Sequence, residues 1–247
     1  MSPLELKITQ PDAVRDDVPR HLGIIPDGNR RWAKDHGLPV AKGFLAGARR
    51  IPGILRLCSD RGIEFVSLWM LSESNLRRPA VERAAMIELA EWTITVLAER
   101  RQWRLQLIGQ LDLLPPSTRD SMRAAVATTE DVDGPVVNLA LGYTGRNDIT
   151  TAVRSLLLSP DARRSAGAEI AENLTPDQIR THLSTGDQPD LDLVVRTSGE
   201  ERLSGFMTWQ IAESELYFSP RLWPDFDESD FDAAMESYRD RDRRFGI

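Results

Sequence analysis

The chain has 247 residues, 41% of them hydrophobic and 28% charged, which is ordinary for a folded protein of one large or two small domains. Its formal net charge of −7 argues against nucleic acid as a partner, because non-specific nucleic-acid binding needs a basic surface. The polar N-terminus has no signal-peptide core and no apolar run approaches the ~20 residues of a membrane span, so we expect a cytoplasmic protein with no integral membrane segment.

Residues 1–19 are polar and are expected to form an N-terminal arm ahead of a single domain over residues 20–247. Apolar, β-rich runs predict strands at residues 22–25, 64–71, 105–109, 136–143 and 191–195. Helical spacing of apolar residues and capping signals predict helices at residues 46–60, 80–101, 115–130, 148–158 and, within a polar spacer that carries no site, 174–183. This alternation is typical of an α/β protein with a central, mostly parallel β-sheet flanked by helices.

The turn that follows the first predicted strand is the first candidate site. Pro26 stops the apolar run, and Asp27-Gly28-Asn29 forms a turn before the helix-compatible sequence RRWAK. Backbone N–H groups at a helix start, beside Arg30 and Arg31, suit a phosphate, and Asp27 could hold a divalent metal that a diphosphate also touches. The alternative is a capped turn without a ligand, because Asp, Gly and Asn are the usual turn residues.

Three further predicted strands also end in polar residues, namely Ser72 to Arg78, Gly145-Arg146, and Arg196 to Ser204. Ligands of an open parallel sheet sit at the carboxyl ends of its strands, so these segments fit a pair of substrates with two diphosphates and a metal. Solvated loops are the alternative, because charged loop residues are usually just exposed. The chain has no Walker A pattern, GxGxxG fingerprint, zinc-ligand spacing or GxSxG elbow, which argues against the common nucleotide, zinc and serine-hydrolase sites.

Six ordered motifs between His21 and Gly246 resemble those of the cis-prenyltransferases, the family of undecaprenyl diphosphate synthase. Three lie in the first part of the chain: H-x4-PDGN-x-RWA (His21 to Ala33), S-x2-N-x2-RP (Ser72 to Pro79) and Y-x-GR (Tyr143 to Arg146). The others are RTSGE-x-RLS-x-F with WQ and ELYF (Arg196 to Phe218), LWPDF (Leu222 to Phe226) and R-x-RRFG (Arg241 to Gly246). The resemblance implies a homodimer or related dimer and a hydrophobic tunnel that holds the growing prenyl chain.

The resemblance also implies a role for each matching residue. Asp27 would be catalytic, binding Mg²⁺ and the allylic diphosphate with help from Gly28, Asn29, Arg30 and Arg31, with Arg78 nearby. Trp32 and Ser72 belong to the same substrate-binding set, and Asn75 would lie near the reacting carbons. The acceptor diphosphate would be held by Arg196, Arg202 and Ser204, and approached by Arg244 and Gly246 of the C-terminal motif. Glu215 would complete the metal site, from this subunit or from the other.

The departures from the family pattern cluster around the allylic end. Val40 and Phe44 stand where the family typically has Arg and His, so two polar diphosphate contacts are expected to be lost. Arg30, at a position that is usually Gly, is a candidate to compensate for them. The other departures are Leu71, Ser74, Leu76, Thr144, Asp148 and Glu213.

Bulky residues near the expected tunnel predict a short product. Met70 stands where long-chain members have a small residue, and Trp69 and Trp92 add bulk nearby. A Met side chain occupies several methylenes of space, comparable with part of an isoprene unit, so we expect a product of about C10 to C15. Ordinary core packing is the alternative role for Met70.

These features favour an Mg²⁺-dependent short-chain prenyl diphosphate synthase with irregular, lavandulyl-type coupling. In that hypothesis dimethylallyl diphosphate joins head-to-middle to a second allylic diphosphate, such as another dimethylallyl or a geranyl diphosphate, with or without ring closure. The alternatives are regular cis head-to-tail condensation with isopentenyl diphosphate and a non-catalytic partner subunit. Such subunits tend to lack the metal Asp and the RTSGE motif, and this chain has Asp27 and Arg196 to Glu200.

Overall fold

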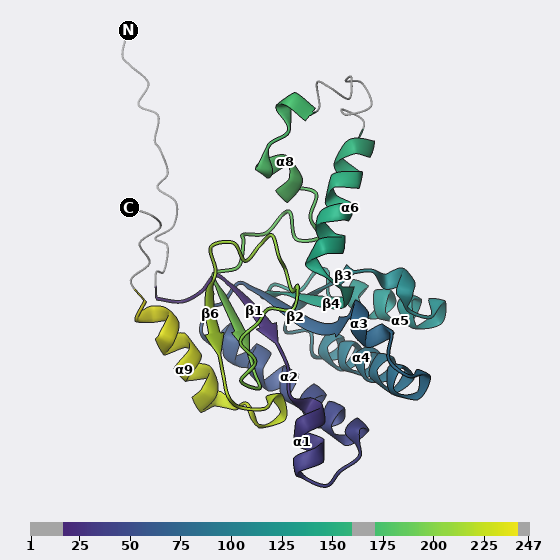
Figure 1. Ribbon diagram of the computed structural model, residues 1–247, viewed down its shortest axis with the longest axis vertical. Helices are drawn as coiled ribbons and strands as arrows, with labels where there is room; N and C mark the ends of the chain where they lie inside the picture. Colours follow the sequence, from purple (N-terminus) through teal and green to yellow (C-terminus); the bar gives the residue numbers. More distant parts are fainter. Residues whose placement is uncertain (1–16, 160–170, 242–247) are drawn as a thin grey trace.

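The computed structural model describes residues 17–159 and 171–241. Its strands form one six-stranded sheet in the order β3-β4-β2-β1-β5-β6 (Figure 1). The strands are β1 (His21–Ile25), β2 (Phe65–Ser72), β3 (Arg104–Gly109), β4 (Val136–Tyr143), β5 (Leu193–Arg196) and β6 (Glu215–Phe218). Every pairing among them is parallel, which confirms the predicted α/β class.

Helices and one irregular segment cover the two faces of this sheet. The helices are α1 (Asn29–Asp35), α2 (Val40–Asp60), α3 (Glu73–Leu76), α4 (Ala80–Arg100), α5 (Pro116–Ala127), α6 (Gly145–Leu158), α8 (Pro176–Arg180) and α9 (Glu228–Arg239). Figure 1 shows α9 beside β6, and α4 and α5 at the other end of the sheet. Among the described helices we find none long and apolar enough to span a membrane.

The core is divided by the sheet into two clusters, because successive side chains of a strand point to opposite faces. Leu22 and Ile24 of β1 pack with the buried side chains of α2, α4, α5 and α9. Ile25 faces the other way and packs with Phe206 and Met207 of the segment before β6. All eight residues of β4 are buried, as expected for a parallel strand covered on both faces.

Helix α2 begins at Val40, six residues before the predicted start at residue 46. Gly43 and Gly47 weaken the helical signal there, because Gly disfavours a helix interior by about 1 kcal/mol relative to Ala. Both glycines are needed for packing: a Cβ atom at Gly43 would lie 2.1 Å from the backbone oxygen of Asn29. The sequence signal for a helix is therefore weakest where α1 approaches α2.

The sequence analysis missed two elements near the C-terminal end. β6 pairs with β5 at the edge of the sheet, where its four residues are only partly buried. α9 is capped by the side chain of Asp227, and it buries Phe231, Ala234 and Tyr238 at helical spacing. Because that spacing is present in the sequence, α9 could have been predicted.

A buried row of hydrogen bonds crosses the sheet below the site. Nδ1–H of His21 donates to the carbonyl of Pro189 at 2.7 Å, and Nε2 accepts from the hydroxyl of Ser67 at 2.8 Å. The Asn138 amide donates to Ser67 Oγ at 2.9 Å and to Oε1 of Gln188 at 2.7 Å. Gln188 and Pro189, which join this row, lie just after the polar spacer predicted over residues 159–186.

We expect this arrangement to make stability depend on pH. Desolvation lowers the pKa of His21 from 6.5 to about 4, so between these values the unfolded chain binds a proton that the folded chain does not. The free energy of unfolding should fall as pH decreases through this window, by about 3 kcal/mol in all. Urea unfolding at pH values from neutral to about 4 measures this free energy, and the His21→Gln variant should show a weaker dependence of it on pH. Parallel pH profiles for the two proteins would contradict this account.

Candidate active site

The carboxyl ends of four strands surround one cavity of about 800 Å³, although Gly145 and Arg146, predicted at the third of these ends, are absent from its lining. Asp27 after β1, Ser72 at the end of β2, Thr144 after β4 and Arg196 at the end of β5 all line it. The parallel sheet explains this, since the carboxyl ends of its strands open at one edge. The volume is within the ~300–1,000 Å³ typical of pockets that enclose a small ligand.

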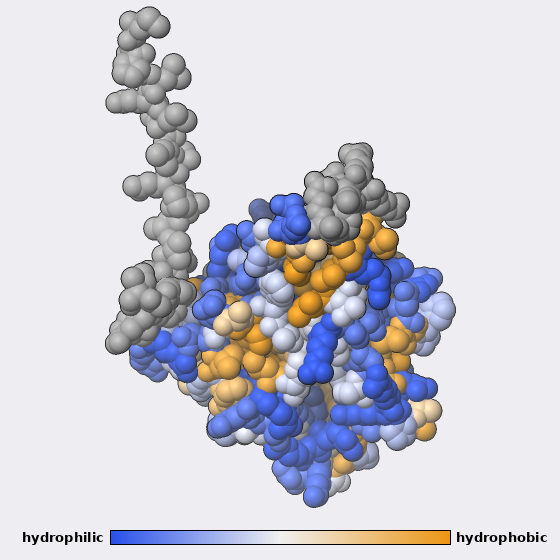
Figure 2. Space-filling model, turned by 45° about the horizontal axis from the view of Figure 1, so that its top comes forward, coloured by the Kyte–Doolittle hydropathy of each residue, from blue (hydrophilic) through white to orange (hydrophobic). Residues whose placement is uncertain are grey.

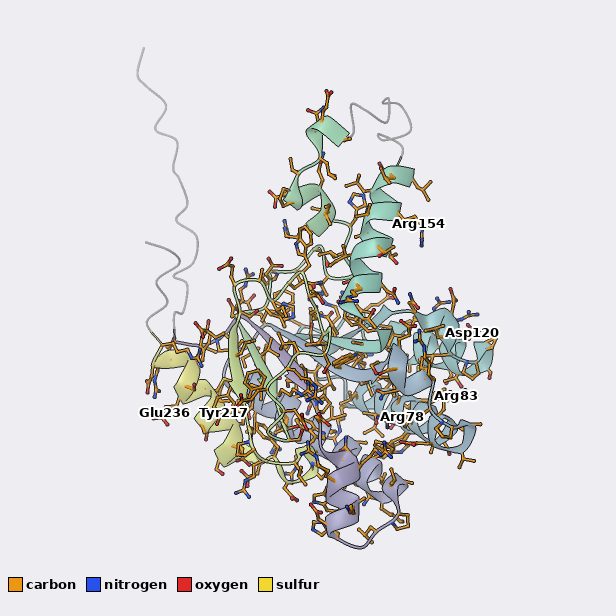
Figure 3. All side chains as sticks on the ribbon, in the orientation of Figure 1. Arg78, Arg83, Asp120, Arg154, Tyr217 and Glu236 are labelled. Carbon is orange, nitrogen blue, oxygen red and sulfur yellow. The ribbon has the colours of Figure 1, made fainter. Side chains whose placement is uncertain are left out.

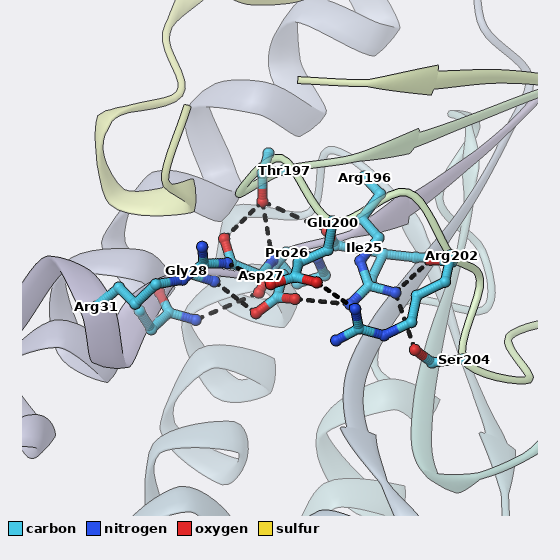
Figure 4. Close-up of polar contacts among 11 residues, drawn as sticks. Ile25, Pro26, Asp27, Gly28, Arg31, Arg196, Thr197, Glu200, Arg202 and Ser204 are labelled. Atoms are coloured by element: carbon cyan, nitrogen blue, oxygen red, sulfur yellow. Dashed lines mark hydrogen bonds and ion pairs between the residues drawn. The ribbon is translucent and has the colours of Figure 1, made fainter. Parts of the chain in front are cut away.

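Asp27 and Arg196 form an ion pair at the cavity wall (Figure 4). Nη2 of Arg196 lies 2.8 Å from Oδ2 of Asp27, and Oδ1 of Asp27 accepts the backbone N–H of Gly28 at 2.7 Å. The Thr197 hydroxyl accepts the Asp27 backbone N–H at 2.8 Å and donates to its carbonyl at 2.7 Å. The end of β5 therefore fixes both the backbone and the carboxylate of Asp27.

Arg196 is also joined to the loop that follows β5. Its Nη1 donates to Ser204 Oγ at 2.9 Å and to the carbonyl of Arg202. Its Nε and the hydroxyl of Ser198 are buried without a hydrogen-bond partner among the described residues. An unpaired buried donor is costly, and the oxygens of an anionic ligand are suitable acceptors for it. This observation supports the predicted anion site.

Glu200 bridges two arginines that the sequence analysis assigned to different diphosphates. Its Oε1 lies 3.3 Å from Nη2 of Arg31 in α1, and its Oε2 pairs with Arg202 (Figure 4). All three side chains line the cavity. The two predicted diphosphate subsites are thus neighbours joined by one carboxylate.

Glu82 makes a second bridge, between Arg78 and Arg30. Its Oε1 lies 2.7 Å from Nη1 of Arg78 and 3.7 Å from Nε of Arg30. Arg78 comes just before α4 (Figure 3), and it also approaches the sulfur of Met86 at 3.8 Å. The sequence analysis missed Glu82, although its i, i+4 spacing from Arg78 was a usable signal.

The start of α1 depends on glycines for its geometry. Gly28 has φ of 108°, in the left-handed region that favours glycine, and it precedes Asn29 at the start of α1. Oδ1 of Asn29 is buried without a partner among the described residues, and a Cβ atom at Gly47 would lie 2.0 Å from it. The approach of α2 therefore sets where Asn29 lies in the cavity wall.

The deeper part of the cavity is apolar. Trp69 and Met70 of β2 line it together with Phe44, Met86, Leu89 and Ala90. Trp69 stacks on Phe206, with ring centroids 5.3 Å apart. Cationic side chains and an apolar lining in one cavity match a ligand with an anionic head and an apolar tail.

Three predicted positions lie elsewhere. Trp92 does not line the cavity and is 42% exposed on α4, so its role in limiting chain length has no support from the lining and stays a prediction. Trp32 is also absent from the lining, because its Nε1–H donates to Asp225 at 2.7 Å and its ring stacks on His36. Val40 is 37% exposed and outside the lining, whereas Phe44 lies in it.

The predicted metal ligands are not brought together within one chain. Glu215 is the first residue of β6 and pairs in register with Leu193 near the start of β5, whereas Asp27 follows the end of β1. The Glu215 carboxylate is paired with Arg241. Within residues 17–159 and 171–241 there is no group of three or more His, Cys, Asp or Glu side chains placed to hold a metal. A contribution of Glu215 from a second subunit stays a prediction, and Arg244 and Gly246 lie outside the described residues.

The fold and the cavity thus define a class of protein: a parallel α/β protein whose strand ends surround a site suited to an anionic head and an apolar tail. A family model described as "Putative undecaprenyl diphosphate synthase" matches residues 25–246. Isoprenyl transferase 1 of Streptomyces avermitilis is 45% identical over 231 residues, covering 94% of this chain and 90% of that protein. The (2Z,6E)-farnesyl diphosphate synthase of Thermobifida fusca is 49% identical over 229 residues, covering 92% and 90%.

A solved structure agrees with these matches. The lavandulyl diphosphate synthase of Lavandula x intermedia, in complex with dimethylallyl diphosphate, has a TM-score of 0.86 at 31% identity, covering 94% of this chain and all of that one. The chain belongs to the undecaprenyl diphosphate synthase family of prenyltransferases, which confirms the resemblance seen in its motifs.

The packing of α2 against Asn29 can be tested with a matched pair of glycines. We expect Gly47→Ala to destabilise the protein by about 1–3 kcal/mol and to displace Asn29, because the added methyl overpacks the contact. Gly53, in the same helix, has no atom within 4 Å of an added Cβ, so Gly53→Ala should be neutral or stabilising by up to about 1 kcal/mol. Urea midpoints and turnover measure both effects. Equal behaviour of the two variants would count against this packing.

Proposed function

We propose that the chain is an Mg²⁺-dependent, short-chain cis-prenyl diphosphate synthase that joins an allylic diphosphate to isopentenyl diphosphate. The observation that carries the proposal is the division of the cavity into an arginine-rich part, which includes Arg196 and Arg202, and an apolar part around Met70 and Met86. One substrate head and one prenyl tail fit these two parts. The 49% identity to a (2Z,6E)-farnesyl diphosphate synthase over nearly the whole chain supports the regular reaction.

Asp27 is suited to help bind Mg²⁺. Its carboxylate is 37% exposed at the cavity, and Mg²⁺ is commonly bound by one or two carboxylates together with phosphate oxygens of the substrate. Bound there, Mg²⁺ would neutralise charge on the leaving diphosphate. Arg30, Arg31 and Arg78 would add to that stabilisation while the allylic carbon develops cation character.

The acceptor would lie on the other side of the Asp27–Arg196 pair. Arg196, Arg202 and Ser204 would bind its diphosphate, and the unpaired Nε of Arg196 would gain an acceptor. Asn75 and Ser72 also line the cavity and would lie near the reacting carbons. Loss of a proton after bond formation then gives the new double bond.

Irregular coupling, which the sequence analysis favoured, is the second candidate. The likeness to the lavandulyl diphosphate synthase structure and the apolar Phe44 in the cavity support it. Two observations reduce its weight: the farnesyl-type relative has the higher identity, and Val40 lies outside the cavity, so its apolar side chain removes no contact there.

A homodimer is also part of the proposal. Figure 2 shows apolar surface, in orange, next to the grey segment between α6 and α8. Leu157 and Leu158 at the end of α6 are 49% and 55% exposed, and Leu174 is 43% exposed. Such side chains could be covered by a second copy, which is the kind of partner that the resemblance implies.

Substrate combinations distinguish these functions. Pure protein with Mg²⁺ should convert dimethylallyl or geranyl diphosphate only when isopentenyl diphosphate is present, giving a product of about C10 to C15 with a new cis double bond. Mass spectrometry and NMR of the dephosphorylated alcohols identify the product. A branched or cyclic C10 product from dimethylallyl diphosphate alone would establish irregular coupling instead. If the folded wild-type protein has no turnover on any combination, the non-catalytic subunit is favoured. If it is active, the folded Asp27→Asn variant should lose at least about 10²-fold in kcat.

Chain length gives a separate test of the apolar part of the cavity. Met70→Ala and Met86→Ala should each shift products toward longer chains by about one isoprene unit, because each removes several methylenes of bulk from the lining. Trp92→Ala removes a larger side chain outside the cavity and should leave the product unchanged. If only Trp92→Ala lengthens the product, the lining identified here is not the chain-length determinant.

A further inference from the structure

Helix α3 is a single turn that carries two of the proposed site residues. Ser72 caps it, with Oγ accepting the backbone N–H of Asn75 at 3.1 Å, and Asn75 Oδ1 accepts the backbone N–H of Ser72 at 2.9 Å. This box uses the Asn75 oxygen, and its amide nitrogen makes no hydrogen bond within the described part of the chain. One helical turn is not stable alone, because nucleation costs more than its one or two hydrogen bonds return. The orientation of Asn75 therefore depends on what holds α3.

Leu76 anchors α3 in the core, and Glu73 supplies a polar contact at the start of the turn. Its Oε2 accepts from Nδ2 of Asn147 at 2.8 Å, across 74 residues of sequence, and its Oε1 pairs with Arg77. Arg77 belongs to the same turn and its side chain is 76% exposed, so it ties α3 to nothing else. Among the described residues, the bond to Asn147 is the side-chain hydrogen bond that joins α3 to an element other than the adjoining strand β2. The Glu73 side chain is only 23% exposed, which favours a persistent bond.

Asn147 lies in the first turn of helix α6, which is itself held by several hydrogen bonds. Its backbone N–H donates to Oγ1 of Thr144, which caps α6, at 3.2 Å. The backbone N–H of Gly145 donates to the carbonyl of Gly205 at 2.7 Å. Asp148 accepts the hydroxyl of Tyr143 at 2.9 Å and the backbone N–H of Ser184 at 3.1 Å. α3 is thus fastened to a rigid part of the molecule.

We propose that Glu73 and Asn147 are a positioning pair that sets α3, and through it Asn75 and Ser72, over the reacting carbons. This inference rests on the proposed function, because the pair can affect turnover only if the protein is a prenyl diphosphate synthase. The next residue, Ser74, is one of the positions where this chain departs from the family pattern. The carboxylate one residue earlier reaches Asn147 in this chain.

The kinetic test is a double-mutant cycle. Glu73→Ala and Asn147→Ala should each lower kcat by about 10- to 100-fold, because small displacements of positioning groups cost this much, and should change KM for the allylic diphosphate by less than about twofold. The double variant should be no slower than the slower single variant, because each single substitution already removes the same contact between Glu73 and Asn147. Glu73→Gln keeps an accepting oxygen and should recover most of the loss. Thr150→Ala, on the exposed side of α6, is the matched control and should be unaffected.

Hydrogen exchange tests, without any measurement of turnover, whether the contact between Glu73 and Asn147 holds α3 in place. The backbone amide of Asn75 should exchange faster in Asn147→Ala than in wild type or Thr150→Ala, while the amides of β4 keep their protection. Independent, multiplicative losses of kcat, or unchanged exchange at Asn75, would overturn the proposal. So would an Arg77→Ala variant that reproduces Glu73→Ala while Asn147→Ala stays fully active. If wild type has no turnover but exchange responds as expected, the proposed function fails and the positioning contact stands.

Discussion

The charge of Arg196 is almost removed from water at the end of β5, and one carboxylate, Asp27, lies opposite it. Burying a charge costs several kcal/mol per ion, and the cost is recovered only where the partner geometry is good and the remaining donors are satisfied. Here Ser204 and a backbone carbonyl satisfy part of the guanidinium, but Nε has no hydrogen-bond partner in the part of the chain that the structure describes. The pair joins the ends of β1 and β5, and Thr197 locks their backbones together. Within residues 17–159 and 171–241, the cavity is therefore arranged around a cation whose hydrogen bonding is incomplete.

The local charge of the site is opposite to that of the chain. The protein carries −7 overall, yet the described lining contains more arginines than carboxylates: Arg30, Arg31, Arg77, Arg78, Arg196 and Arg202 against Asp27, Glu73 and Glu200. A cleft with low-dielectric walls concentrates the field of such groups. Glu200 and Glu82 each bridge two of the arginines, which limits repulsion between them before an anion arrives. A diphosphate carries more charge than one carboxylate, so it can take the place of Glu200 or Glu82 between the arginines. A ligand with a single carboxylate has less charge with which to do so, so we expect the site to prefer multiply charged head groups.

The sequence was sufficient for features set by local patterns and insufficient for those set by packing. The buried strands and the turn at Asp27 follow from apolar runs and turn residues, and the parallel sheet follows from their alternation with helices. The place of Trp92 relative to the cavity was not evident because α4 has apolar residues on nearly all sides, so its sequence does not show which side faces the cavity. Glu215 was separated from Asp27 by strand register, which no local pattern encodes. The spacing of Glu82 from Arg78 was visible in the sequence, but the contacts of Glu82 with Arg30 and of Asn147 with Glu73 join separate elements and appear only when the chain is folded.

The distinction between regular and irregular coupling is a matter of which carbon of the second substrate faces the allylic cation. Both reactions need the same head-group binding, so the arginines around Asp27 do not distinguish them. What differs is the placement of the reacting carbons, and the cavity lining includes α3 residues and the end of β2, where Asn75 and Ser72 are proposed to face those carbons. α3 is held by Glu73 against Asn147, and both lie in segments where this chain departs from the family pattern. Under the proposed function, we therefore expect the choice of product to depend more on the contacts that hold α3 than on Val40, which lies outside the cavity.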